Sequence, residues 1–300
     1  MAYDVIALAL LSAAAWGASS PLSKAGLERG GTPFQVAMTV VVVSVVTYWA
    51  ALFATGTTLL LRPLWVVGLF AVTGLLATAV ARVVLYAGVQ RVGASVNSAV
   101  VNTRPVWSMT LAVLLLGEAV TAQNVLGIVV VVLGLVVLAF SKGGDISGWE
   151  LRDLSFPLLG AIIFAVGNVA RRFGLSATGM HPLEAVAINE TAGLLGLLFV
   201  VVVWRGNDVR EFLHAPRDAY AYFVGCGLVS SVALFTLFAA LSRGRVVLVD
   251  PLSSPTSLFA ILFTFLFLRE VERVTWRLLV GAVLVVLGVV LITGPQVLTL

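Results

Sequence analysis

The sequence predicts an all-α, polytopic membrane protein with ten transmembrane helices, arranged as two inverted five-helix repeats. Three observations support this fold class. The composition is too apolar for a soluble protein, apolar runs long enough to cross a bilayer follow one another closely, and the second half of the chain repeats polar landmarks of the first half.

The composition separates this chain from soluble proteins. Of its 300 residues, 60% are hydrophobic and only 11% are charged, whereas soluble domains contain about 25% charged residues. A soluble fold would leave much of this apolar surface in water. The formal charge of +4 is spread over many short loops, so no basic stripe indicates a nucleic-acid partner. Asp4 is the first charge, and we therefore expect the first helix to be retained rather than cleaved as a signal peptide.

Apolar runs predict the individual helices. A hydrocarbon core about 30 Å thick is crossed by roughly 20 apolar helical residues, and Gly, Pro and charged residues mark the loops between such runs. The run at 40–46 does not alternate polar and apolar residues as a barrel strand does. We expect transmembrane helices at residues 4–24, 34–55, 64–88, 94–116, 122–140, 154–174, 183–204, 219–241, 247–268 and 275–293.

An internal repeat predicts the topology. Segments 86–138 and 238–292 share polar residues in the same order, and the matched pairs are Arg91 with Arg243, Glu118 with Glu270, Gly127 with Gly281 and Gly134 with Gly288. Residues 1–145 and 146–300 therefore form the two predicted repeats, with five helices each. An odd number of helices per repeat makes the two repeats insert in opposite orientations, as in many secondary transporters.

These motifs resemble the EamA-type branch of the drug/metabolite transporter superfamily, and the resemblance covers nearly the whole chain. It rests on Trp16-Gly17, on Leu116-Gly117-Glu118 to Gly127, on Leu268-Arg269-Glu270 to Gly281, and on Asn168, Arg171, Arg172 and Pro182. The resemblance implies ten helices around a central cavity, alternating access, and movement of small metabolites. It also implies cytoplasmic termini, whereas the loop charges alone favour the opposite orientation.

Arg104 is the first candidate for substrate binding. An ionisable group inside the membrane is costly and is a functional candidate by default. Asn97, Arg104 and Ser108 share one helix face, and Asn102 lies one turn away around the helix. Pro105 removes a backbone donor and frees a carbonyl beside them. A purely structural role, in which polar side chains only join helices, is the alternative.

The corresponding helix of the second repeat has a similar pattern. Asp250, Ser254 and Ser257 share a face, and Pro255 interrupts the helix. Interrupted segments at matching places in two repeats indicate a binding site near the membrane midplane. Arg104 would then meet an anionic group such as a carboxylate, while Asp250 and the serines would receive an amine or hydroxyls. An amino acid or similar zwitterion suits this pattern, although nucleotide sugars and drugs stay open.

Two further candidates lie in other helices. Glu190 lies within the span at 183–204, where it either pairs with Arg104 or Arg82 or carries a proton. An Arg104–Glu190 bridge would be a structural strut between two helices. Trp16 lies in the middle of the first helix, away from the interfacial belt, where it either stacks on a ligand or fills space.

We therefore predict a secondary transporter of the cell membrane that exports a small organic solute, with the solute and the lipid bilayer as its partners. No Walker A sequence indicates ATP hydrolysis. No HExxH or GxSxG motif indicates an enzyme. No metal or organic cofactor is expected, because no ligand cluster occurs and Cys226 is the only cysteine. An intramembrane enzyme, or a passive channel or lipid-handling scaffold, remains the alternative.

Overall fold

The structure is a computed structural model of the chain. It describes residues 2–56, 63–81, 84, 87–88, 91–92, 97, 100–141, 150–205, 216–256, 258–260, 262–263 and 276–298. These residues contain helices and connecting turns but no strand, which confirms the predicted all-α class.

The helices follow the predicted spans, and each of the ten spans overlaps at least one of them. They are α1 (Ala2–Glu28), α2 (Pro33–Thr55), α3 (Leu64–Gly74), the π-helix η1 (Leu75–Val80), α5 (Arg104–Leu116), α6 (Ala122–Ser141), the 3₁₀-helix η2 (Leu151–Leu154), α7 (Ser155–Thr178), α8 (Pro182–Arg205), α10 (Arg217–Arg243), α11 (Val246–Leu252) and α13 (Trp276–Leu298).

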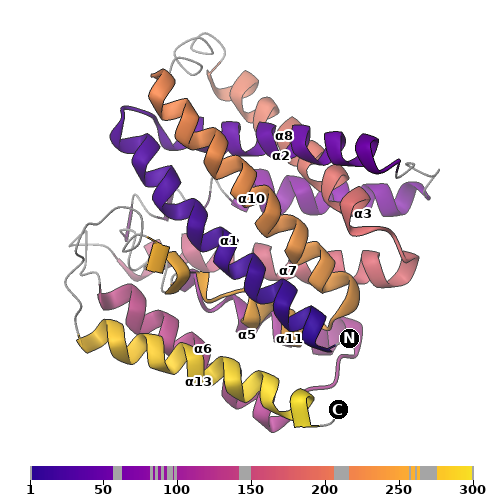
Figure 1. Cartoon of the computed structure of the whole chain (residues 1–300), viewed down its shortest axis with the longest axis vertical. Coiled ribbons are helices and arrows are strands. Elements are labelled where there is room, and N and C mark those ends of the chain that lie inside the picture. The colour runs from indigo at the N-terminus through magenta and orange to yellow at the C-terminus, as the bar shows by residue number, and fades with distance from the viewer. Residues whose placement is uncertain are drawn as a thin grey trace.

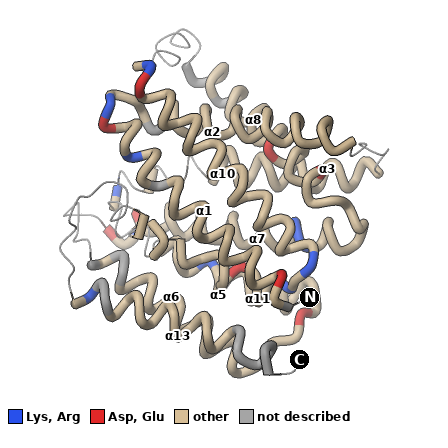
Figure 2. The backbone as a smooth tube through the Cα atoms, in the orientation of Figure 1, with Lys and Arg blue, Asp and Glu red and all other residues tan. Residues whose placement is uncertain are grey.

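Length and composition make this a polytopic membrane protein. In the described part of the chain, five helices are long and apolar enough to cross a membrane, namely those within α1, α2, α7, α8 and α10. Large apolar side chains such as Phe53, Leu114 and Phe199 are exposed on the outside of the bundle, where lipid would surround them. Figure 2 shows that most charged residues lie near the ends of the helices, with a few between α5, α7 and α11.

Local sequence signals set the helix ends. At the start of α2, the Thr32 hydroxyl accepts a hydrogen bond from the Gln35 backbone N–H at 3.3 Å, and the Gln35 side chain accepts from the Thr32 N–H at 2.9 Å. This reciprocal capping box satisfies donors that have no partner within the helix. At the end of α5, Gly117 has a φ of 63°. Glycine adopts this left-handed conformation without a steric penalty, so it ends the helix.

Equivalent helices of the two repeats pack against each other. Helices α6 and α13, the last helices of the two repeats, lie side by side (Figure 1). A methyl group at Gly127 would lie 3.0 Å from the Gly288 carbonyl oxygen, and one at Gly134 would lie 2.9 Å from the Gly281 carbonyl oxygen. Residue numbers rise along one helix as they fall along the other, so these equivalent helices are antiparallel. This arrangement agrees with inverted repeats, and the short distances show that these glycines allow the two helices to pack closely.

Two predicted spans are interrupted at matching places. A turn at Asn102 and Thr103 precedes α5, and α11 ends at Leu252 before a turn through Ser253 to Pro255. Proline explains both breaks, because Pro105 and Pro255 lack the backbone N–H that a continuing helix needs. The break before α5 shortens the helix expected at 94–116. The π-helix η1 was not expected, since nothing in its sequence indicates it.

Candidate substrate-binding cavity

A cavity of about 500 Å³ lies between the two repeats. Its wall is formed by residues of α1, α2, η1, α5, α7, α8 and α10, together with the segments that precede α5 and follow α11. Five predicted site residues are among them: Trp16, Asn102, Arg104, Glu190 and Ser254. The wall also carries hydroxyl groups from both repeats and apolar side chains, including Ser12, Ser19, Ser230, Thr256, Val40, Phe164 and Leu237.

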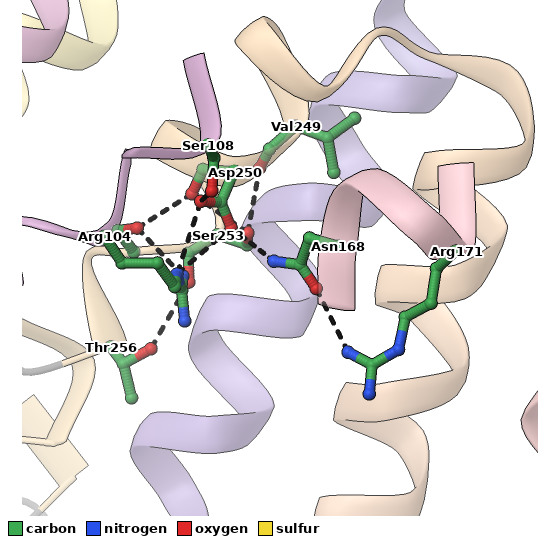
Figure 3. Close-up of polar contacts among 9 residues, drawn as sticks. Arg104, Ser108, Asn168, Arg171, Val249, Asp250, Ser253 and Thr256 are labelled. Atoms are coloured by element: carbon green, nitrogen blue, oxygen red, sulfur yellow. Dashed lines mark hydrogen bonds and ion pairs between the residues drawn. The ribbon is translucent and has the colours of Figure 1, made fainter. Parts of the chain in front are cut away.

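The interrupted helices place Arg104 at the cavity wall. The Arg104 Nε lies 3.1 Å from Asp250 Oδ1 in an ion pair, and its Nη2 donates to the Ser254 hydroxyl at 3.0 Å. The side chain of Arg104 is 22% exposed, whereas that of Asp250 is 0% exposed. Figure 3 shows Arg104 and Asp250 pointing toward each other from their two helices. The guanidinium therefore faces the cavity while its carboxylate partner lies behind it.

Asp250 is satisfied within the protein. Its carboxylate accepts hydrogen bonds from the Ser108 hydroxyl and from Asn168 Nδ2, the latter at 2.6 Å, in addition to the contact with Arg104. A buried carboxylate with several hydrogen-bond donors and a cationic partner is held in one position. Asp250 thus contacts both Arg104 and Ser108, but neither Asp250 nor Ser108 lines the cavity. The expectation that Asp250 itself faces the substrate does not fit this position.

Glu118 positions the start of α11. Its two carboxylate oxygens accept hydrogen bonds from the backbone N–H groups of Val246 and Val247, at 2.9 and 3.0 Å. A carboxylate at a helix N-terminus satisfies free donors and interacts favourably with the helix dipole. The repeated Glu of the sequence motif is therefore a helix cap in the first repeat. Its counterpart, Glu270, lies outside the described residues.

A second polar network lies on the opposite side of Asn168. Arg171 donates to Asn168 Oδ1 at 3.1 Å and, through Nε and Nη2, to Asn189 Oδ1 at 3.3 and 3.2 Å. Asn189 Nδ2 in turn donates to Glu190 Oε1 at 3.2 Å. The predicted Arg104–Glu190 bridge is not formed, because Arg104 pairs with Asp250. The other predicted partner of Glu190, Arg82, lies outside the described residues.

Sequence reasoning missed Arg171 and Asn168 as cavity residues. They served only as family motifs, and the expected span of 154–174 placed Arg171 in its last turn. Helix α7 continues to Thr178, so Arg171 is 3% exposed and lies inside the bundle. The signal was present, because Asn168 and Arg171 are three residues apart and therefore share a helix face.

The remaining predicted residues have other positions. Asn97 is buried against Gly88 and does not line the cavity, and its Oδ1 accepts no hydrogen bond from the described residues. Ser257 lies outside the described residues. Trp16 reaches the wall beside Gly17, where a methyl group would lie 2.8 Å from the backbone N of Ala260. This close contact between α1 and the second repeat explains why glycine follows the tryptophan.

The cavity is closed at one end by apolar packing. Its wall extends to Ser23 near the end of α1 and to Val36 near the start of α2. Toward the start of α1, the bundle is filled by buried side chains of α1, α10 and α11, which include Val5, Ala9, Phe238, Leu241, Val246 and Val249. Arg172 strengthens this closed end by donating to the Leu241 and Ser242 carbonyls at 2.8 and 3.1 Å.

Comparison with known proteins agrees with this arrangement of two helical repeats around a cavity. Residues 5–140 and 153–294 match the EamA-like transporter family. The chain belongs to this family. The family is one of transporters, and its helices make the chain a multi-pass membrane protein, as the resemblance of its motifs predicted.

Individual relatives add detail on similarity. A WAT1-related, chloroplastic protein of Arabidopsis thaliana is 26% identical over 215 residues, which cover 70% of this chain and 50% of that protein. The chain thus spans about half the length of this relative. A crystal structure of another protein superposes with a TM-score of 0.82 at 17% identity. The superposition covers 98% of this chain and 97% of the crystallised chain. At this low identity, the structural likeness shows the fold alone.

Proposed function

We propose that this EamA-family member is a secondary transporter that exports a small, amino-acid-like solute across the cell membrane by alternating access. The observation that carries the proposal is the position of Arg104. Described residues accept hydrogen bonds from its Nε and Nη2, which leaves the Nη1 hydrogens for a ligand in the cavity. A guanidinium stays charged in any environment and binds carboxylates with well-defined geometry.

The shape of the cavity supports alternating access. It extends toward the α1–α2 turn, while apolar side chains fill the bundle toward the start of α1. In alternating access, each state opens the binding site toward one side of the membrane only. A cavity that extends toward one end of the bundle fits one such state. The antiparallel packing of α6 against α13 supports a second state, since inverted repeats can exchange their conformations.

Cys226 offers a direct test of ligand binding. It is the only cysteine of the chain and lines the cavity, so a bound solute should slow its alkylation. We expect L-leucine to protect Cys226 of the purified protein from N-ethylmaleimide. Arg104→Gln should weaken this protection, while Arg277→Gln, at the exposed start of α13, should not. Equal protection of the wild-type and Arg104→Gln proteins would contradict the role of Arg104.

Transport itself requires reconstituted vesicles. We expect saturable, counterflow-competent movement of radiolabelled L-leucine in liposomes that contain the purified protein. Non-saturable flux would favour a channel instead. The proposed direction is export, so cells that overproduce the protein should retain less of the solute, and increased retention would contradict this direction.

A further inference from the structure

Glu190 presents a carboxylate to the same cavity from the side of α8. It is 2% exposed and is one of the wall residues. Thr78 of η1 donates to its Oε1 at 2.9 Å, and Asn189 donates to the same oxygen at 3.2 Å. Neither donor is charged. Among the described residues, none donates to Oε2, and none forms an ion pair with Glu190.

The position of this carboxylate is fixed by close packing. Gly74, at the start of the π-helix, lies against the Asn189 backbone, and Gly193 of α8 lies against the Thr78 side chain. Asn189 is itself held, because its Oδ1 accepts from Arg171 and from the Thr73 hydroxyl at 3.0 Å. Because the side-chain oxygen of Asn189 is held on one side, its side-chain NH₂ group points toward Glu190 and donates to it. A π-helical turn within an α-helix is often found at functional sites.

The two buried acids, Asp250 and Glu190, differ in the partners that bind their carboxylates. Asp250 has a cationic partner, Arg104, and two further donors, and it lies behind the wall. Glu190 has two neutral donors on one oxygen and lies at the wall. A carboxylate inside a membrane is stabilised most by a cation. Glu190 is therefore the acid to which a positively charged group of a ligand would bind.

The sum of the charges limits the ligand further. Among the described residues, the polar networks at the cavity contain two cations, Arg104 and Arg171, and two acids, Asp250 and Glu190. Their formal charges cancel, so a ligand with a net charge would leave that charge uncompensated inside the membrane, at a high cost. A zwitterion adds no net charge. Its two poles would also meet different wall residues, the anionic pole Arg104 and the cationic pole Glu190.

We propose that Glu190 is the ammonium subsite of the cavity and thereby selects ligands that carry a protonated amine. The ligand's N–H groups would donate to Oε2 of Glu190, which accepts no hydrogen bond from the described residues. This inference rests on the proposed function, since it assumes that the cavity binds the transported solute. It assigns to Glu190 the amine that the sequence pattern alone assigned to Asp250.

Three ligands of similar shape test the subsite. L-leucine carries both poles, isocaproate lacks the amine, and isoamylamine lacks the carboxylate. Each is titrated into the purified full-length protein, and protection of Cys226 from N-ethylmaleimide is measured. In the wild-type protein, we expect half-protection by L-leucine at a concentration at least about tenfold below that of isocaproate, since a charged hydrogen bond contributes this much. This comparison requires no variant.

Variants then locate the effect. Glu190→Gln should remove the preference for L-leucine over isocaproate, and Glu190→Asp should restore part of it. Glu184→Gln is the matched control, because Glu184 is a buried acid of the same helix that does not line the cavity. It should keep the wild-type preference. Thermal unfolding of each protein checks that it is folded.

The outcomes separate the two proposals. If isocaproate and L-leucine protect the wild-type protein equally, the ammonium subsite is wrong, while the carboxylate site at Arg104 stands. If a folded Glu190→Gln protein keeps the full preference, the subsite is also wrong. If none of the three ligands protects Cys226, both the subsite and the proposed amino-acid-like substrate are wrong.

Discussion

Removal of either partner of the Arg104–Asp250 pair should destabilise the protein, and removal of both should cost much less than the sum. The ion pair joins α5 of the first repeat to α11 of the second, with the Arg104 Nε 3.1 Å from Asp250 Oδ1. Breaking a buried pair leaves one charge without compensation, which is costly in a medium of low polarity. The double variant Arg104→Gln/Asp250→Asn leaves neither charge.

The exposure of the charge that remains decides which single variant loses more stability. Arg104→Gln leaves the carboxylate of Asp250, which is 0% exposed, so we expect a loss at the upper end of the range for broken buried pairs, about 3–5 kcal/mol. Asp250→Asn leaves Arg104, whose side chain is 22% exposed to a cavity that water can enter. Hydration of the guanidinium should reduce that loss to about 1–3 kcal/mol.

Unfolding of the purified proteins in detergent measures these losses. The wild-type, both single variants and the double variant form a cycle, and we expect a coupling free energy of at least about 1–3 kcal/mol. The double variant should be more stable than Arg104→Gln alone. Strictly additive losses would refute the ion pair as a structural link. A stable Arg104→Gln protein with unchanged transport would refute both the structural and the substrate-binding role of Arg104.

Three further predictions concern other parts of the fold. Glu118→Ala should lower stability by about 0.5–2 kcal/mol, because it removes the cap of α11, and Glu118→Gln should lower it less; equal losses would contradict the capping role. Gly134→Ala should destabilise the α6–α13 contact by about 1–3 kcal/mol. Gly68→Ala in α3, where a methyl group meets nothing within 4 Å, should not destabilise the protein in the same unfolding assay, because alanine favours a helix over glycine. A reporter fused after Leu300 should be active in the cytoplasm, and activity only outside would show that the loop charges predicted the orientation correctly.

Much of the fold follows from local sequence. The apolar runs predict the spans because lipid requires about 20 apolar residues per crossing, and the order of Arg91, Glu118, Arg243 and Glu270 reveals the repeat. Proline predicts where the helix around residue 255 stops, since its missing N–H acts on the nearest turn. The family follows from the same motifs, because they are contiguous in the chain.

The partners of the charged residues do not follow from local sequence. Arg104 could pair with Glu190 or with Asp250, and periodicity alone does not distinguish acids on different helices. The helix ends were also uncertain, so Arg171 was expected in the last turn of its helix although α7 continues beyond it. Each misassignment concerns a contact between helices, which depends on how they cross.

By itself, then, the sequence determined the membrane class, the repeats, the family, and Arg104, Glu190 and Asp250 as the acids and cation of interest. Only the tertiary structure decided that Asp250 lies behind the cavity wall and that Glu190 lies on it. The physical reason is that hydrophobicity and periodicity are properties of one segment. The exposure of a buried charge instead depends on the side chains that neighbouring helices bring to it, as Ser108, Asn168 and Arg104 show at Asp250.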